Sequence, residues 1–132
     1  MLNSENIFSH VELNRVPNLS LAYLGDSVFE LLVRTYLVSA KEYGHGELHN
    51  AALKFVSAPA QADAAKRIMP LLDEEELTVY KRGRNAKVNS VPHNATIEQY
   101  HAATGLETLF GYLYLAGRYD RLNELFNVVT GD

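Results

Sequence analysis

Apolar residues recur along this chain at the three- and four-residue spacing of helices, and strict alternation of apolar and polar residues is rare. The pattern predicts an all-α protein without strands. The expected helices cover residues 19–41, 46 or 47 to 56, 58–69, 73–84, 97–116 and 120–129, and residues 85–95 have the composition of a loop.

Capping residues mark where most of these helices begin. The expected N-caps are Ser57, Asp73, Thr96 and Asp120. Glu76 and Gln99 stand three residues after two of these caps, which predicts two capping boxes, and Gly117 is expected to close the helix that precedes it. Because no repeat or linker interrupts the pattern, we expect a single domain over residues 1–132.

The most apolar stretch, residues 19–38, is long enough to raise the question of a membrane span. Asp26, Glu30 and Arg34 lie in its middle, and each would be costly in hydrocarbon. We therefore expect a buried helix of a soluble protein and no membrane partner. Glu30 and Arg34 are four residues apart, which predicts an ion pair between neighbouring turns.

The composition narrows the classes of function. The chain has 132 residues, and its 12 Lys and Arg against 16 Asp and Glu give a net charge of −4, which argues against a polycation that coats nucleic acid. The absence of cysteine excludes disulfides, thiolate zinc sites and cysteine nucleophiles. It fits the reducing cytoplasm, where we expect the protein, because the first twelve residues do not have the pattern of a signal peptide.

Gly25 and Asp26 interrupt the apolar helix predicted over residues 19–41. Both are unfavourable inside a helix, and their apolar neighbours predict that both are buried. A buried carboxylate must be paired, protonated or bound to a metal. A purely structural explanation stays open, in which Asp26 hydrogen-bonds a nearby loop and Gly25 lets another helix approach closely.

Glu107 interrupts a second apolar helix in the same way, with Gly111 one turn later. Taken alone, Glu107 is equally well explained as a solvated edge position. If the two helices pack together, however, Asp26 and Glu107 share one pocket, and paired carboxylates are ligands for hard cations. A Mg²⁺ ion there would activate water and stabilise the leaving group of a phosphodiester.

A short basic run ends the helix predicted over residues 73–84. Its polar members are Lys81, Arg82, Arg84, Asn85 and Lys87. Compensation of the helix dipole is one explanation. The run is dense for that purpose, and Gly83 within it would let a phosphate approach the backbone, so we also predict phosphate contacts. His45 and His49 lack the His-Glu-x-x-His pattern, and a zinc site is therefore not favoured.

Two segments together resemble the ribonuclease III family. Residues 21–30, LAYLGDSVFE, are similar to its signature helix, and residues 104–115, TGLETLFGYLYL, are similar to its second acidic helix. The resemblance implies a homodimer that depends on Mg²⁺, with Mn²⁺ as a substitute, and cleaves double-stranded RNA to leave 5′-phosphate and 3′-hydroxyl ends. Asp26 and Glu107 would be catalytic residues and metal ligands, and the basic run would bind the RNA.

The chain ends soon after the second motif, so we expect no double-stranded-RNA-binding domain, as in the compact Mini-III branch of the family. That branch implies maturation of the 23S ribosomal RNA precursor, with a large-subunit ribosomal protein as a further candidate partner. Ala22 and Thr104 stand where the larger enzymes have acidic residues, which predicts a site with fewer carboxylates. Mini-III proteins share the first replacement, and Thr104 is expected to hold a water bound to the metal.

Two other classes of function remain as alternatives. A helical RNA-binding or ribosome-assembly protein of the same fold would bind RNA without cutting it. A dimer that serves only protein interaction would have no affinity for RNA. The pair Asp26 and Glu107 argues for the enzyme, because neither alternative needs two carboxylates in one pocket.

Overall fold

The computed structural model describes residues 8–40, 43–87 and 94–131, and within these ranges it contains helices and no strand. The all-α prediction is confirmed. The helices are α1 (His10–Asn14), α2 (Asn18–Ala40), α3 (Leu48–Val56), α4 (Ala58–Ile68), α5 (Glu74–Arg84), α6 (Ile97–Leu115) and α7 (Tyr119–Thr130), with 3₁₀ turns η1 (His45–Glu47) and η2 (Met69–Leu71). None of the described helices is long and apolar enough to cross a membrane.

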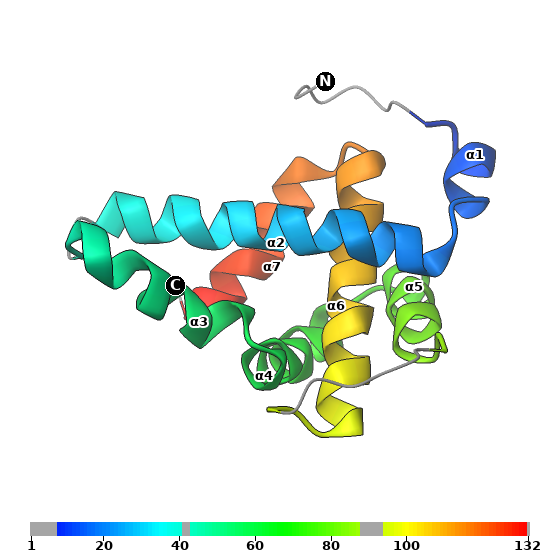
Figure 1. The fold of residues 1–132 in the computed structure, drawn as a ribbon. Helices are drawn as coiled ribbons and strands as arrows, with labels where there is room; N and C mark the ends of the chain where they lie inside the picture. Colours follow the sequence, from blue (N-terminus) through cyan, green and yellow to red (C-terminus); the bar gives the residue numbers. More distant parts are fainter. Residues whose placement is uncertain (1–7, 41–42, 88–93, 132) are drawn as a thin grey trace.

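Helices α2 and α6 cross at the centre of the molecule, and α4 and α5 pack on either side of α6 (Figure 1). The segment 103–113 of α6 is buried except at Glu107, as expected for an apolar stretch at the centre of a fold. Phe29 of α2 packs edge to face on Phe110 of α6 and on Phe126 of α7, with ring centroids 5.4 and 5.9 Å apart. The core is therefore built around the crossing of the two helices that carry the candidate carboxylates.

The crossing depends on two glycines. A Cβ atom added to Gly25 would lie 1.6 Å from the carbonyl oxygen of Glu107, and one added to Gly111 would lie 2.1 Å from the carbonyl oxygen of Leu21. Only residues without a side chain allow the two backbones to come this close. The expectation that Gly25 lets another helix approach is confirmed, and that helix is α6.

The capping boxes form as predicted. Asp73 accepts from the Glu76 N–H while the Glu76 side chain accepts from the Asp73 N–H, and Thr96 and Gln99 make the same reciprocal pair. Ser57 accepts from the N–H of Ala60 at the start of α4. These bonds satisfy backbone donors that the first turn of a helix leaves unpaired.

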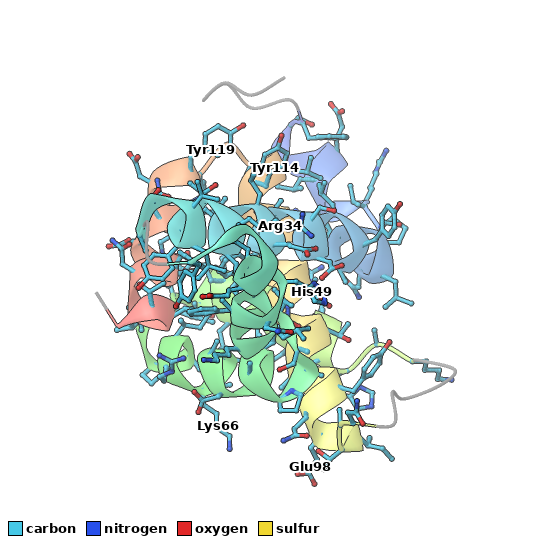
Figure 2. The ribbon with its side chains drawn as sticks, turned by 60° about the vertical axis from the view of Figure 1, so that its left-hand side comes forward. Arg34, His49, Lys66, Glu98, Tyr114 and Tyr119 are labelled. Carbon is cyan, nitrogen blue, oxygen red and sulfur yellow. The ribbon has the colours of Figure 1, made fainter. Side chains whose placement is uncertain are left out.

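The start of α7 differs from the prediction. Gly117 adopts a positive φ of 72° and closes α6 as expected, but α7 begins at Tyr119, so Asp120 lies in its first turn instead of capping it. The short connection explains the difference, because the chain reverses within 116–118 and enters the next helix at once. Tyr114 and Tyr119 stack across this reversal with ring centroids 5.6 Å apart (Figure 2).

A buried ion pair joins α5 to α7. Glu76 is fully buried, and its two carboxylate oxygens accept from Nε and Nη2 of Arg121, each at 2.8 Å. Burial acts to raise the pKa of Glu76, but the hydrogen bonds from Arg121 and from the Asp73 backbone, with the charges of Arg121 and Arg118, outweigh it and leave the pKa below its usual value. Glu76 is therefore held as a carboxylate, and α5 is fixed on the rest of the fold.

Candidate active site

The structure brings Asp26 and Glu107 together. Asp26 follows Gly25, the residue of α2 that lies against the backbone of Glu107 in α6. The side chains interact directly, since Asp26 acts on the Glu107 carboxyl both through a hydrogen bond and through its charge. The close crossing at the glycines thus places one carboxyl group from each helix in a single site.

The two carboxyl groups differ in their surroundings. Asp26 is exposed, so the expectation that its apolar neighbours bury it is wrong. The reason is the helical turn of about 100° per residue, which points Gly25 at α6 and Asp26 away from the interior. Asp26 is accordingly open to a solute, while Glu107 is half-buried.

Glu107 holds a proton at neutral pH in this structure. Burial raises its pKa to about 9, and the hydrogen bond and the negative charge of Asp26 act in the same direction, whereas Gln61 acts to lower it. Two adjacent carboxyl groups without a cation favour the state in which one of them is neutral. The explanation of Glu107 as a solvated edge position is therefore wrong.

Gln61 of α4 is a third member of the site that the sequence did not reveal. Its side chain lies beside Glu107 and is only 3% exposed, and its Nε2 has no hydrogen-bond partner among the described residues. A sequence signal existed, because Gln61 stands three and four residues before Ala64 and Ala65 on the apolar stripe of α4. A glutamine in such a stripe needs a reason to be buried.

The donor set fits a small hard cation. Mg²⁺ usually binds proteins through one or two carboxylates and keeps several waters for the rest of its shell. Asp26 and Glu107 would be the acidic ligands, and since the described residues contain no group of three or more His, Cys, Asp or Glu side chains that could hold a metal, waters would fill much of the shell. The buried amide of Gln61 beside Glu107 adds a polar group to the site, and its Nε2 makes no hydrogen bond of normal geometry with the described residues.

Ala22 and Thr104, which stand where the larger enzymes have acidic residues, are both packed in the interior of the fold. Ala22 is buried in α2, and Thr104 is buried in α6 with its hydroxyl donating to the carbonyl oxygen of Tyr100 at 3.0 Å. That bond leaves the Thr104 oxygen available as an acceptor. Its role in holding a water stays a prediction.

The basic run lies at the C-terminal end of α5. Lys81, Arg82, Asn85 and Lys87 are exposed, and Arg84 is half-buried with its guanidinium carbon 5.9 Å from the centre of the Tyr80 ring. None of its four cations pairs with an acidic side chain of the described residues. Their charges are therefore free to meet an external anion.

Gly83 has a different role from the predicted one. It is buried, and a Cβ there would lie 2.2 Å from Oγ1 of Thr108 and 3.1 Å from Cα of Gly105. The prediction that Gly83 admits a phosphate is wrong, because α6 already occupies that space. The glycine instead seats the basic end of α5 on α6, one residue from Glu107.

A groove of about 370 Å³ lies between α2 and α3 and is mostly apolar. Arg34 and His49 both line it, and they project from neighbouring helices in Figure 2. Arg34 donates to Glu30 at 2.7 Å, which confirms the predicted ion pair. Leu53 of the groove is 46% exposed and Val38 is 64% exposed, so the groove opens onto an apolar surface.

Comparison with known proteins identifies the family in which this arrangement of helices and side chains occurs. The Ribonuclease III domain family matches residues 19–118, a range that contains both carboxylates and the basic run. The chain belongs to the ribonuclease III family. Within it, the chain is similar to proteins called Mini-ribonuclease 3, which confirms the resemblance of the two sequence motifs.

Three of these relatives show the extent of the match. The protein from Brevibacillus brevis is 46% identical, and the alignment covers 92% of this chain and 96% of the relative. The proteins from Clostridium tetani and Staphylococcus aureus are 43% and 36% identical, with 92% of this chain covered in both cases and 82% and 90% of the relatives.

The fold of this ribonuclease III-family chain also matches a solved structure. A crystal structure of a protein from Fusobacterium nucleatum superimposes with a TM-score of 0.83 at 30% sequence identity, over 90% of this chain and 95% of the other. The predicted fold class, a helical ribonuclease III-like domain, is therefore confirmed.

Proposed function

We propose that this ribonuclease III-family protein is an endoribonuclease that hydrolyses double-stranded RNA with Mg²⁺, or with Mn²⁺ in its place, and matures the 23S ribosomal RNA precursor in the cytoplasm. The observation that carries the proposal is the pairing of Asp26 and Glu107 across the α2–α6 crossing. The names of the curated relatives support a ribonuclease III-family endoribonuclease. The choice of RNA, metal and precursor follows from the chemistry of the site and from the resemblance to the Mini-III branch.

Asp26 and Glu107 would hold the cation. When bound, Mg²⁺ supplies a Lewis acid that stabilises charge on the phosphodiester and activates water for an attack that leaves a 5′-phosphate and a 3′-hydroxyl. Asp26 is open to solvent and gives the ion and the substrate access from outside, while the half-buried Glu107 anchors the site to the core. Glu107 would have to be ionised to hold the cation, since a ligating carboxyl group must be ionised.

The basic end of α5 would bind the RNA backbone. Lys81, Arg82, Arg84 and Lys87 offer charges to phosphates, and Asn85 offers an amide. The bases of an A-form duplex lie in a deep, narrow major groove that side chains cannot read, so recognition rests on phosphates, shape and 2′-hydroxyl groups. The close contact of Gly83 with Thr108 holds the end of α5 that carries these cations near Glu107.

A homodimer would supply one site for each strand of the duplex. Four large apolar side chains of α2 are exposed in the single chain, Leu19, Tyr23, Leu31 and Val38, and Tyr23 is 85% exposed. Exposed apolar residues grouped on one helix mark a surface for protein association. A second copy of the chain is the partner we propose there, and a large-subunit ribosomal protein that presents the precursor remains a further candidate partner.

The alternative of an RNA-binding protein without catalysis explains the basic run but not the acidic pair. Two carboxyl groups side by side repel a phosphate backbone, and they raise the cost of ionising Glu107. A cation that binds both of them removes that cost. The paired site is thus a disadvantage to a protein that only binds RNA.

The decisive experiment compares Asp26→Asn with Asp63→Asn on a perfect RNA duplex in Mg²⁺. Asp63 is an exposed residue of α4 that pairs with Arg67 at 3.2 Å, so its replacement removes the same charge outside the site. Asp26→Asn is expected to lower the cleavage rate about a thousandfold or more, since a metal ion contributes several kcal/mol to the transition state. Asp63→Asn is expected to cleave normally.

Retained cleavage by Asp26→Asn would overturn the proposed mechanism. Analysis of the RNA ends tests the reaction type, because the proposal requires 5′-phosphate and 3′-hydroxyl products. The substrate is tested by sequencing 23S ribosomal RNA ends in a strain that lacks the protein, where extended precursors are expected to accumulate. Mature ends in that strain would exclude the 23S precursor as the substrate.

A further inference from the structure

Gln61 is a polar side chain on an otherwise apolar face. The other buried residues of α4 are Ala62, Ala64, Ala65 and Ile68, and Gln61 is 3% exposed. Its Nε2 has no hydrogen-bond partner among the described residues. A buried amide donor without a partner is costly, and native proteins contain few of them. Packing of the apolar face of α4 therefore does not explain why a glutamine stands here.

The surroundings of Gln61 point to the acidic pair. Helix α4 packs along α6 (Figure 1), and the Gln61 amide lies beside the carboxyl group of Glu107, where it can act as a hydrogen-bond donor. An amide N–H donates to carboxylate oxygens. Gln61 is thus the polar neighbour on α4 that is placed to hold the Glu107 carboxylate.

We propose that Gln61 is a positioning residue, whose Nε2–H group donates to one oxygen of the Glu107 carboxylate and turns the other oxygen toward the divalent cation. This inference rests on the proposed function of Asp26 and Glu107 as the metal ligands. Carboxylates that ligate metals are commonly held by such outer hydrogen bonds, and loss of one costs about 10- to 100-fold in metal affinity or activity. The Nε2–H donor lies beside Glu107 without a hydrogen bond of normal geometry, and it is available for that bond.

A role in packing makes the opposite prediction for a simple substitution. Leucine is close to glutamine in size, is apolar, and needs no hydrogen bond. If Gln61 only filled space, Gln61→Leu would bind metal normally. If Gln61 positions Glu107, the same substitution removes an unpaired polar group from the core and also removes the support of the metal ligand.

The experiment compares Gln61→Leu with Gln99→Leu. Gln99 is the matched control, because its amide closes the capping box at the start of α6 by accepting from the Thr96 N–H at 3.0 Å. Mn²⁺ alone is titrated into each protein and followed by electron paramagnetic resonance, the melting temperature is measured without metal, and duplex RNA cleavage is measured across Mg²⁺ concentrations.

Gln61→Leu is expected to bind Mn²⁺ about 10- to 100-fold more weakly, to need correspondingly more Mg²⁺ for cleavage, and to melt at the same or a higher temperature. Gln99→Leu is expected to melt at a lower temperature with unchanged Mn²⁺ affinity. Should Gln61→Leu not fold, Gln61→Met offers the same comparison with an unbranched side chain.

Unchanged Mn²⁺ affinity in a folded Gln61 variant would overturn this inference while the proposed function stands. If the unsubstituted protein binds no Mn²⁺ and Asp26→Asn cleaves normally, the proposed function fails and this inference fails with it. Weaker Mn²⁺ binding by Gln61→Leu, without a loss of melting temperature, supports positioning and not packing.

Discussion

Gly25 and Gly111 hold α2 and α6 together at backbone distance, so that a Cβ on Gly111 would lie 3.1 Å from the amide nitrogen of Gly25. A side chain on Gly25 would meet the backbone of α6 at Glu107, and backbone cannot turn aside as a side chain can. The same contact that closes the core therefore places the two carboxyl groups side by side. Stability and the geometry of the site depend on one point in the structure.

Gly25→Ala is expected to destabilise the protein by about 2 kcal/mol or more through overpacking, although alanine is the better helix former by about 1 kcal/mol. Denaturant unfolding measures the change. The control is Gly46→Ala, because a Cβ on Gly46 meets nothing within 4 Å. Equal stability of the two variants would contradict the close crossing.

The pH dependence of stability without metal is a second test. Glu107 has a folded-state pKa of about 9 against an ordinary value of 4.5, so its contribution is fully present below about pH 4.5 and is lost progressively as the pH rises toward 9. We expect the melting temperature in EDTA to fall across this range. Glu107→Gln cannot ionise and should flatten the fall.

The expected difference between the two proteins is largest near pH 9 and absent near pH 4.5. Thermal melts in EDTA at several pH values measure it. Parallel profiles for the unsubstituted protein and Glu107→Gln would mean that burial and Asp26 do not raise the pKa of the Glu107 carboxyl group. Added Mg²⁺ should raise the melting temperature of the unsubstituted protein at high pH more than that of the variant, because a ligand of the folded state stabilises it.

The salt dependence of RNA binding tests the basic end of α5. Replacing Arg82, Arg84 and Lys87 by glutamine should flatten the slope of log affinity against log salt by about two to three units, since each phosphate contact releases a counterion. Lys54 and Lys66 are exposed lysines of α3 and α4 and serve as the control. Lys66 points away from the core into solvent in Figure 2.

The cleavage rate at saturating RNA and low salt separates binding from chemistry. The triple variant should retain most of that rate, because Asp26 and Glu107 are unchanged. An unchanged salt slope would show that the basic run serves only the dipole of α5. A lost rate with normal binding would place one of the three side chains in the chemical step.

Association through α2 is tested by Tyr23→Glu. A charge on this 85% exposed side chain is expected to convert the proposed dimer to a monomer, because an unpaired charge is costly to bury in an interface. Sedimentation velocity measures the change. Ile97→Glu, at a position that is 63% exposed on α6, should leave the dimer intact. A dimer with Tyr23→Glu would exclude this face as the interface.

The sequence predicts a helix start well where capping residues mark it. Asp73 with Glu76, and Thr96 with Gln99, are reciprocal pairs within one turn, so their bonds follow from the sequence. The five-residue helix α1 was missed, since a segment that short shows almost no periodicity. Such short elements form because the rest of the fold supports them.

The site was predicted in part. Two apolar helices interrupted by carboxylates indicated the pair, but the exposure of Asp26 and the burial of Gly83 depend on how helices are rotated against each other, which periodicity does not determine. Gln61 comes from a third helix. Gln61 lies beside Glu107 because α4 packs against α6, and no local sequence pattern predicts such a long-range contact.

Helix α6 is fixed on both sides of Glu107, with Gly105 close to the backbone of Tyr80 in α5 and Gly111 against Leu21 in α2. A helix confined in this way cannot shift to accommodate a substrate of different shape. Directed evolution toward other RNA shapes should therefore find few useful changes within α6. We expect altered preferences to arise from exposed positions of α5, such as Arg82, where a side chain can change without moving the backbone beneath it.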